Sequence, residues 1–246
     1  MIATRSHYRK APPMNPYNPY APRADVQAST QSNAFMQKVY GYMSGGLFAT
    51  AITASVVASS DTLVQVIVGN PIVFYGLLLG EIGMVIAFSA LLNRLSTAAA
   101  AALFFAYSVV NGLTLSVIFL AYTASSIGST FFVTAGTFGA VSLYGYATKR
   151  DLSGVGSFAM MGLIGLIIAS IVNIFLKSTM IYWLTTFVGV IVFTGLAAYD
   201  TQKLKRFAST AGAAEQSKVA LQGALMLYLD FINLFLYMLR LLGRRR

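Results

Sequence analysis

Seven long apolar segments, none interrupted by an internal proline, follow residue 38 and restrict what this chain can fold into. Each is close to the ~20 residues that an α-helix needs to cross the hydrocarbon of a bilayer. In lipid every backbone amide must be paired within its own segment, so runs of this kind form helices. Transmembrane β-strands would be shorter and would alternate in polarity. The segments are Tyr40–Ser59, Ile72–Leu92, Ala98–Tyr122, Thr130–Ala147, Ser157–Leu176, Ile181–Tyr199 and Val219–Leu242.

The composition agrees with a membrane protein. Only 10% of the 246 residues are charged and the mean hydropathy is +0.70, whereas about a quarter of the residues of a soluble domain are charged. A net charge of +10 would suggest nucleic acid in a soluble protein. Here the bases lie mostly between apolar segments, where they set topology, so we expect no nucleic-acid partner. The sequence predicts an all-α membrane protein, a seven-transmembrane-helix bundle whose surroundings are the lipid bilayer.

Residues 1–37 differ in composition from the rest of the chain. They hold five of the six prolines and an Asn-Pro-Tyr repeat at 15–17 and 18–20. Such a segment buries too little apolar surface to fold by itself. The predicted organisation is therefore a disordered cytoplasmic N-terminal tail (1–37) followed by a seven-helix transmembrane domain (38–246).

The basic residues predict the orientation. They gather in the tail and in the second, fourth and sixth connections, whereas the first, third and fifth connections carry only Lys177. The positive-inside rule therefore places the N-terminus in the cytoplasm. Arg240 and residues 244–246 conflict with this pattern, because seven complete spans would place them outside. A re-entrant last segment would keep them inside, and the sequence leaves both arrangements open.

Small residues at helical spacing predict places where helices approach closely. Gly76 and Gly80 form a GxxxG pair in the second segment, and Gly45 and Gly162 belong to similar stripes. We assign these stripes a packing role only.

The informative residues are three acids inside or at the edge of apolar segments. Glu81 lies in the middle of the second segment, Asp200 at the cytoplasmic end of the sixth, and Asp230 in the middle of the seventh. A charged side chain at the bilayer centre costs about 2.5–3.5 kcal/mol on insertion scales, so such residues usually serve a function. The alternative for each is a hydrogen-bonded structural acid that holds its helix in the bundle.

Arg94 and Asp200 are expected at similar depth, because the second and sixth segments both end at the cytoplasmic side. A pair between them could latch the mouth of the bundle. If Asp200 also approaches Asp230, the two carboxylates cannot both ionise freely, and such a pair senses pH. When deprotonated, it supplies the hard oxygen ligands that Ca²⁺ prefers. Asn111 and Asn233 are further polar residues that could line a cavity.

Several kinds of chemistry are excluded. The chain has no cysteine, its one histidine is His7 in the tail, and it has no glycine-rich phosphate loop. We therefore expect no cofactor and no enzymatic activity. An intramembrane aspartyl protease would need only two aspartates. However, Asp230 follows Leu229 rather than the glycine of that signature, and the Pro-Ala-Leu element of those proteases is absent.

The same residues carry a resemblance to a known family. Residues 195–202 (Gly-Leu-Ala-Ala-Tyr-Asp-Thr-Gln) and 225–235 (Leu-Met-Leu-Tyr-Leu-Asp-Phe-Ile-Asn-Leu-Phe) are its most specific parts. Residues 148–153, Asn111-Gly112 and the glutamate of the second segment support it. Over about residues 35–243 the chain resembles a bacterial member of the Bax inhibitor-1 (transmembrane Bax inhibitor motif) family.

The resemblance implies a fold in which the last helix is central and wrapped by the other six. It also implies a pH-sensitive Ca²⁺ leak of the bacterial inner membrane, gated by a pair that matches Asp200 and Asp230. Arg94 matches the latch and Glu81 the acid of the second helix, and Glu81 and Asn233 would contact the ion. The alternative function is a non-conducting modulator of a membrane-bound AAA quality-control protease, as associated with some bacterial relatives.

Overall fold

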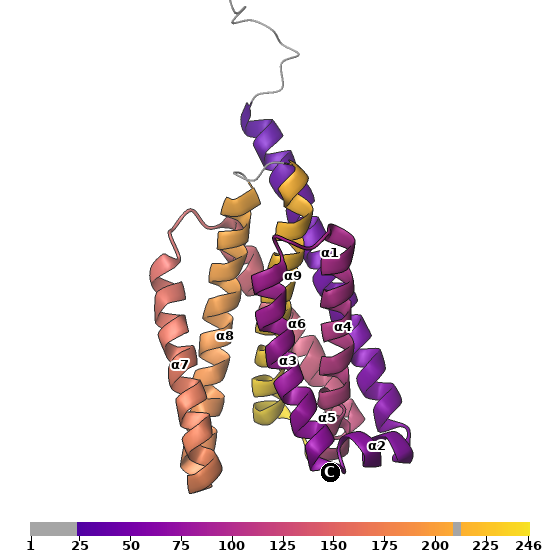
Figure 1. The fold of residues 1–246 in the computed structure, drawn as a ribbon. Coiled ribbons are helices and arrows are strands. Elements are labelled where there is room, and N and C mark those ends of the chain that lie inside the picture. Colours follow the sequence, from indigo (N-terminus) through magenta and orange to yellow (C-terminus); the bar gives the residue numbers. More distant parts are fainter. Residues whose placement is uncertain (1–23, 209–212) are drawn as a thin grey trace, which may run out of the picture.

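The computed structural model describes the backbone of residues 24–208 and 213–246, and the side chains of residues 30–208 and 216–246. Helices make up nearly all of this part of the chain (Figure 1). Seven stretches are long and apolar enough to cross a membrane, which confirms the predicted fold class. The helices are α1 (Ala24–Ala58), α2 (Asp61–Ile67), α3 (Pro71–Leu91), α4 (Thr97–Leu115), α5 (Val117–Ala121), α6 (Ala124–Ala147), α7 (Ser153–Leu176), α8 (Thr179–Ala208) and α9 (Ala213–Leu242).

Short polar residues set where several helices begin. The side chains of Asn70, Ser96 and Thr123 accept backbone N–H groups in the first turns of α3, α4 and α6, which satisfies donors that have no partner inside a helix. Pro71 occupies the first position of α3, where its missing N–H costs nothing. The third span consists of α4 and α5, which are divided at Ser116. The hydroxyl of Ser116 donates to the carbonyl of Leu113 in α4.

The last helix is the most deeply buried span. In the most apolar 18-residue stretch of each span, 67% of the residues are buried in α9, against 11% in α7 and 6% in α3. The principal neighbours of α9 are α1, α4, α6 and α8, whereas α3 packs on α4 and α7 on α8. Figure 1 shows α7 at the edge of the bundle, beyond α8. The outer helices expose large apolar side chains, such as Ile72 and Phe175, as expected of a surface that faces lipid.

The first helix begins earlier than the boundary predicted at residue 37. It starts at Ala24, and Phe35 and Met36, inside the predicted tail, are buried against the rest of the bundle. The polar residues between positions 24 and 37 concealed this extension, because few of its side chains are apolar. The disorder predicted for residues 1–23 lies outside the described residues.

The last helix crosses the bundle without a break, so a re-entrant last segment is not what the structure contains. Its C-terminal end lies opposite the end from which α1 starts (Figure 1). Beyond it, the N–H of Thr123 donates to the carbonyl of Arg244 (3.1 Å), and the N–H of Arg246 donates to the carbonyl of Ala121 (3.0 Å). The terminal arginines are thus held beside the α5–α6 connection, which resolves the conflict in favour of seven complete spans. Which of the two ends faces the cytoplasm stays a prediction.

Glycines mark two of the predicted close contacts, but not all. A Cβ on Gly162 would lie 2.7 Å from Val192, and one on Gly45 would lie 3.3 Å from Phe105. A Cβ on Gly76 or Gly80 would meet no atom within 4 Å. The contact stripe predicted on α3 is therefore wrong, because this face of α3 has no helix beside it.

Candidate functional site

Two of the three predicted acids meet in the interior of the bundle. Asp200 on α8 and Asp230 on α9 are 8% and 5% exposed, and their carboxyl groups lie close enough to interact with each other. An ionised carboxylate can only accept a hydrogen bond. A hydrogen bond between these two carboxyl groups would therefore require that one of them carry a proton.

The pair has little else to neutralise it. Lys203, three residues after Asp200 on α8, attracts the Asp200 carboxylate. Among the side chains that the structure describes, the ion pair within 4.0 Å is Arg206–Asp151, which does not involve the pair. The Oδ2 atom of Asp230 and the hydroxyl of Thr201, the residue after Asp200, are buried without a protein hydrogen-bond partner. Buried polar atoms in this condition are normally satisfied by water or an ion.

Arg94, the predicted latch, is not brought to this pair. It lies in the α3–α4 connection, where its side chain is exposed, and no hydrogen bond or ion pair joins it to either aspartate among the described residues. The reason is packing: α3 lies against α4, while Asp200 lies within α8. The latch role of Arg94 remains a prediction.

The third acid, Glu81 on α3, belongs to a separate network. Its two carboxylate oxygens accept hydrogen bonds from Asn111 Nδ2 (3.0 Å) and Thr114 Oγ1 (2.5 Å), both on α4. The Oδ1 atom of Asn111 accepts from the hydroxyl of Tyr228 on α9 (2.9 Å), and that hydroxyl also lies 2.7 Å from Thr50 Oγ1 on α1. The network therefore joins four helices around a fully buried tyrosine.

Three residues that were predicted to contact an ion or to line a cavity border the same space. A space of about 410 Å³ between α3, α4 and α9 is bordered by Glu81, Asn111 and Asn233. Asn233 donates to the Leu229 carbonyl one turn before it (2.8 Å), which leaves its side-chain oxygen available. Neither Asp200 nor Asp230 borders this cavity, so the Glu81 cavity and the aspartate pair are separate in this conformation.

The geometry of α9 explains how it serves both sites. Tyr228 and Asp230 are two positions apart, which on an α-helix is a rotation of about 200°. Tyr228 therefore points towards α1 and α4, and Asp230 points to the opposite side, towards Asp200 on α8. A single helix thus carries one polar group into each site.

A clamp beside the aspartate pair was not recognised from the sequence. Gln202 on α8 accepts the N–H of Leu152 (2.9 Å) and donates to the carbonyl of Arg150 (2.8 Å), so it ties the α6–α7 connection to α8. Arg206 donates to Gln202 and to Asp151, each at 2.7 Å. The motif at residues 148–153 was the signal, although only the fold reveals its contact with residues 202–206.

The acid of this clamp should not titrate near neutrality. Hydrogen bonds from Arg206, and then from Ser153, lower the pKa of Asp151 to about 2. A lowered folded-state pKa gives stability that is present above the ordinary value near 4 and is lost as the pH falls towards 2. We expect Asp151→Asn to leave any response between pH 6 and pH 8 unchanged, measured as the ratio of activities at the two values. A changed ratio would mean that Asp151 takes part in such a response.

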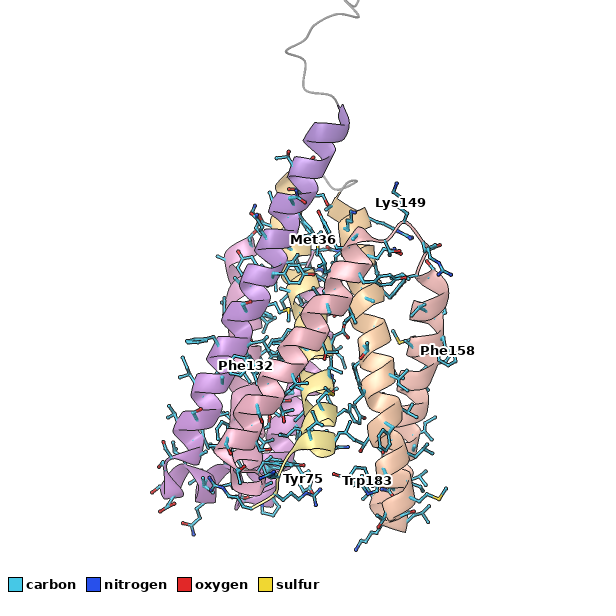
Figure 2. All side chains as sticks on the ribbon, turned by 180° about the vertical axis from the view of Figure 1, so that it is seen from behind. Met36, Tyr75, Phe132, Lys149, Phe158 and Trp183 are labelled. Atoms are coloured by element: carbon cyan, nitrogen blue, oxygen red, sulfur yellow. The ribbon has the colours of Figure 1, made fainter. Side chains whose placement is uncertain are left out.

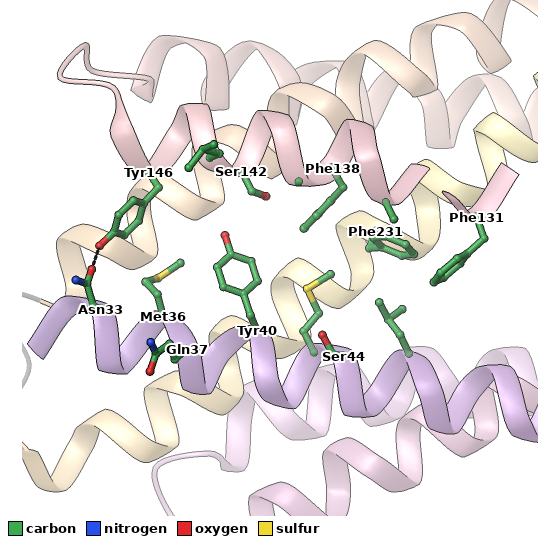
Figure 3. A pocket seen from close by; sticks show the side chains of 15 residues that line it. Asn33, Met36, Gln37, Tyr40, Ser44, Phe131, Phe138, Ser142, Tyr146 and Phe231 are labelled. Atoms are coloured by element: carbon green, nitrogen blue, oxygen red, sulfur yellow. Dashed lines mark hydrogen bonds between the residues drawn. The ribbon is translucent and has the colours of Figure 1, made fainter. Parts of the chain in front are cut away.

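A further cavity of about 620 Å³ lies between α1 and α6, and none of its lining residues is acidic. Figure 3 shows Tyr146 of α6 bonded to Asn33 of α1 at one end of this cavity and Phe231 of α9 near the other. Its wall is mostly apolar and includes the hydroxyl of Ser142, which is buried without a partner. We refer to it below as the α1–α6 cavity.

No preformed metal centre is evident in the part of the chain that the structure describes. No three histidine, cysteine or acidic residues gather there in a way that could hold a metal ion. Because Ca²⁺ takes six to eight oxygen ligands, Asp200 and Asp230 could supply only part of a shell. Water or carbonyl groups would have to complete it.

The fold and the site together are those of a polytopic membrane protein, with seven helical spans and with buried acids on the sixth and seventh. The family model described as "Inhibitor of apoptosis-promoting Bax1" matches residues 32–246. The chain belongs to this family, the Bax inhibitor-1 family, which confirms the resemblance noted in the sequence.

Three relatives illustrate the similarity. The chain is 49% identical to the inner membrane protein YbhL of Escherichia coli over 230 residues, which cover 92% of this chain and 98% of that one. It is 45% identical to an uncharacterised protein of Borreliella burgdorferi, with 87% and 93% covered. It is 44% identical to an uncharacterised protein of Rickettsia prowazekii, with 86% and 90% covered.

Proposed function

We propose that the protein is a pH-sensitive, Ca²⁺-permeable leak of the bacterial inner membrane, with its N-terminus in the cytoplasm and no enzymatic activity or cofactor. The observation that supports the gate is the buried contact between the carboxyl groups of Asp200 and Asp230, which come from two different helices. The location is supported by the description of the E. coli relative as an inner membrane protein.

In the proposed closed state the two aspartates share one proton. Loss of this proton leaves two like charges in contact, and their repulsion drives α8 and α9 apart. The separated carboxylates then offer oxygen ligands to Ca²⁺. Glu81, Asn111 and Asn233 would contact the ion in the neighbouring cavity. Because deprotonation opens the path, flux should rise with pH.

The test is Ca²⁺ entry into proteoliposomes that hold the purified protein, measured at pH 6 and at pH 8. We expect wild-type flux to be greater at pH 8, and Asp200→Ala/Asp230→Ala to show the same flux at both values. Empty liposomes give the background, and circular dichroism checks that the variant is helical. Wild-type flux no greater than that of empty liposomes, from folded protein, would overturn the proposal.

The second candidate is a non-conducting partner of a membrane-bound AAA quality-control protease. The α1–α6 cavity supports it, because its mostly apolar wall lies between two helices that cross the membrane. A membrane helix of a partner could place side chains there. In that case the buried acids would be structural.

Removal of the N-terminal tail separates the two candidates. The deletion should end at residue 23 rather than 37, because Phe35 and Met36 are buried in the bundle. We expect the shortened protein to keep the Ca²⁺ flux of the full chain at both pH values, since the residues proposed to gate the path or to contact the ion all follow position 80. A shortened protein that keeps its fold but loses its activity in the cell would favour the partner role.

A further inference from the structure

A basic pocket lies at the end of the bundle opposite the start of α1. It has a volume of about 610 Å³ between the α7–α8 connection, α8 and the C-terminal end of α9. Figure 2 places Trp183, which borders the pocket, at the opposite end of the bundle from Lys149. Three cationic residues, Lys177, Arg240 and Arg245, border it, and no acidic residue does. We call it the basic pocket.

Two of the three cations lie against one aromatic residue. Arg245 Nη2 donates to the hydroxyl of Tyr182 (2.8 Å), and its guanidinium lies 5.8 Å from the centre of the Tyr182 ring. The Arg240 guanidinium also lies 5.8 Å from this ring, and 5.2 Å from that of Tyr237. Lys177, at the end of α7, borders the same pocket. Three like charges gathered without a carboxylate repel one another, so an anion bound among them would be stabilised.

The backbone that carries Arg245 is held in place. The hydrogen bonds of Arg244 and Arg246 to the α5–α6 connection fix the residues on either side of it, and the N–H of Arg244 also donates to Ser126 Oγ (2.8 Å). A guanidinium on a fixed backbone loses less conformational entropy on binding than one on a free tail. The planar guanidinium also matches the oxygens of a phosphate.

We infer that the basic pocket binds the phosphate group of an anionic phospholipid. Lipid is favoured as the source because the pocket is next to side chains that face the bilayer. Met180 and Leu184, on either side of Tyr182 and Trp183, are 79% and 57% exposed. Tryptophan and tyrosine are enriched at the depth of lipid headgroups, and arginine and lysine side chains form charge-assisted hydrogen bonds with phosphate oxygens. The inference does not depend on whether the protein conducts ions.

The pocket contains its own reporter, because Trp183 is the only tryptophan in the chain. The experiment follows the fluorescence of the full-length protein in neutral detergent during titration with short-chain phosphatidylglycerol. We expect a saturable change in Trp183 emission. Short-chain phosphatidylcholine, which has no net charge, and inorganic phosphate should each give no saturable change over the same concentration range.

Two matched double variants each remove two cations. One pair lies in the basic pocket and the other at the opposite end of the bundle. We expect Arg240→Gln/Arg245→Gln to weaken binding by roughly 30-fold, from the energy per basic residue at an anionic lipid surface. Lys149→Gln/Arg150→Gln, at the other end, should bind like the wild type. Unfolding temperatures would show whether the first variant remains folded, and Lys177→Gln gives a milder second variant.

Three results would overturn the inference. Equal binding of phosphatidylcholine would show that charge is not recognised, and equal binding of inorganic phosphate would make free phosphate the ligand. An unchanged affinity in folded Arg240→Gln/Arg245→Gln would show that the lipid binds elsewhere. None of these results bears on the Ca²⁺ leak, which is tested by flux.

Discussion

Asp230→Asn is expected to abolish the pH dependence of Ca²⁺ flux, so that the ratio of flux at pH 8 to flux at pH 6 falls to about one. Asparagine has nearly the volume of aspartate and can still bond to Asp200, but it cannot ionise. The repulsion that opens the closed state is then missing. For two unit charges 4 Å apart it would be about 4 kcal/mol at an effective dielectric constant of ~20.

The measurement is the proteoliposome assay at the two pH values. Asp200→Asn should behave in the same way, because either substitution leaves a single ionisable group. Asp151→Asn is the matched control, since it removes an exposed acid at the nearby clamp. A folded Asp230→Asn protein with the wild-type pH ratio would show that the aspartate pair is not the sensor.

Gly145→Ala is expected to destabilise the fold by about 2–3 kcal/mol, the upper part of the range for overpacking. Gly145 on α6 packs against the backbone of α8, and a Cβ there would lie 2.1 Å from the Ala198 carbonyl oxygen. Because the obstacle is backbone rather than a flexible side chain, α6 and α8 would have to separate. Ala198 is two residues before Asp200, so the aspartate pair would also be displaced.

Thermal unfolding in detergent measures this effect, with an expected fall of about 5 °C or more in the midpoint. Gly136→Ala, on the same helix, is the control, because a Cβ at this position would meet no atom within 4 Å. That substitution should be neutral or slightly stabilising, since alanine favours helix over glycine. Equal midpoints for both variants would show that the α6–α8 contact is looser than described.

The spans were predictable because hydrocarbon thickness dictates a length and a composition, and both can be counted in a sequence. The start of α1 was not, because between positions 24 and 37 helix formation depends on burying a few side chains such as Phe35 against other helices. The Gly76–Gly80 stripe failed for a related reason. Small residues permit close approach, but they do not supply a neighbouring helix.

The contact between Asp200 and Asp230 could be anticipated, because a carboxyl group inside an apolar segment needs a polar partner and few were available. The hydrogen bonds that join Asn111 to Glu81 and to Tyr228 could not be anticipated. They depend on which way each helix is rotated, and an apolar stripe facing lipid resembles one facing protein. That Arg94 does not reach the aspartate pair could not be predicted either, since the depth of a residue in the membrane does not say which helices are adjacent.

The continuity of α9 affects the kinetics of any conformational transition at the aspartate pair. From Ala213 to Leu242 it has no proline and no break in its helical pattern, so it is expected to move as one body. A rotation that parts Asp230 from Asp200 must also carry the Tyr228 hydroxyl away from Asn111 and Thr50, on the other side of the same helix. The two sites would then switch in one concerted event, and single-molecule records would contain two levels rather than a graded series.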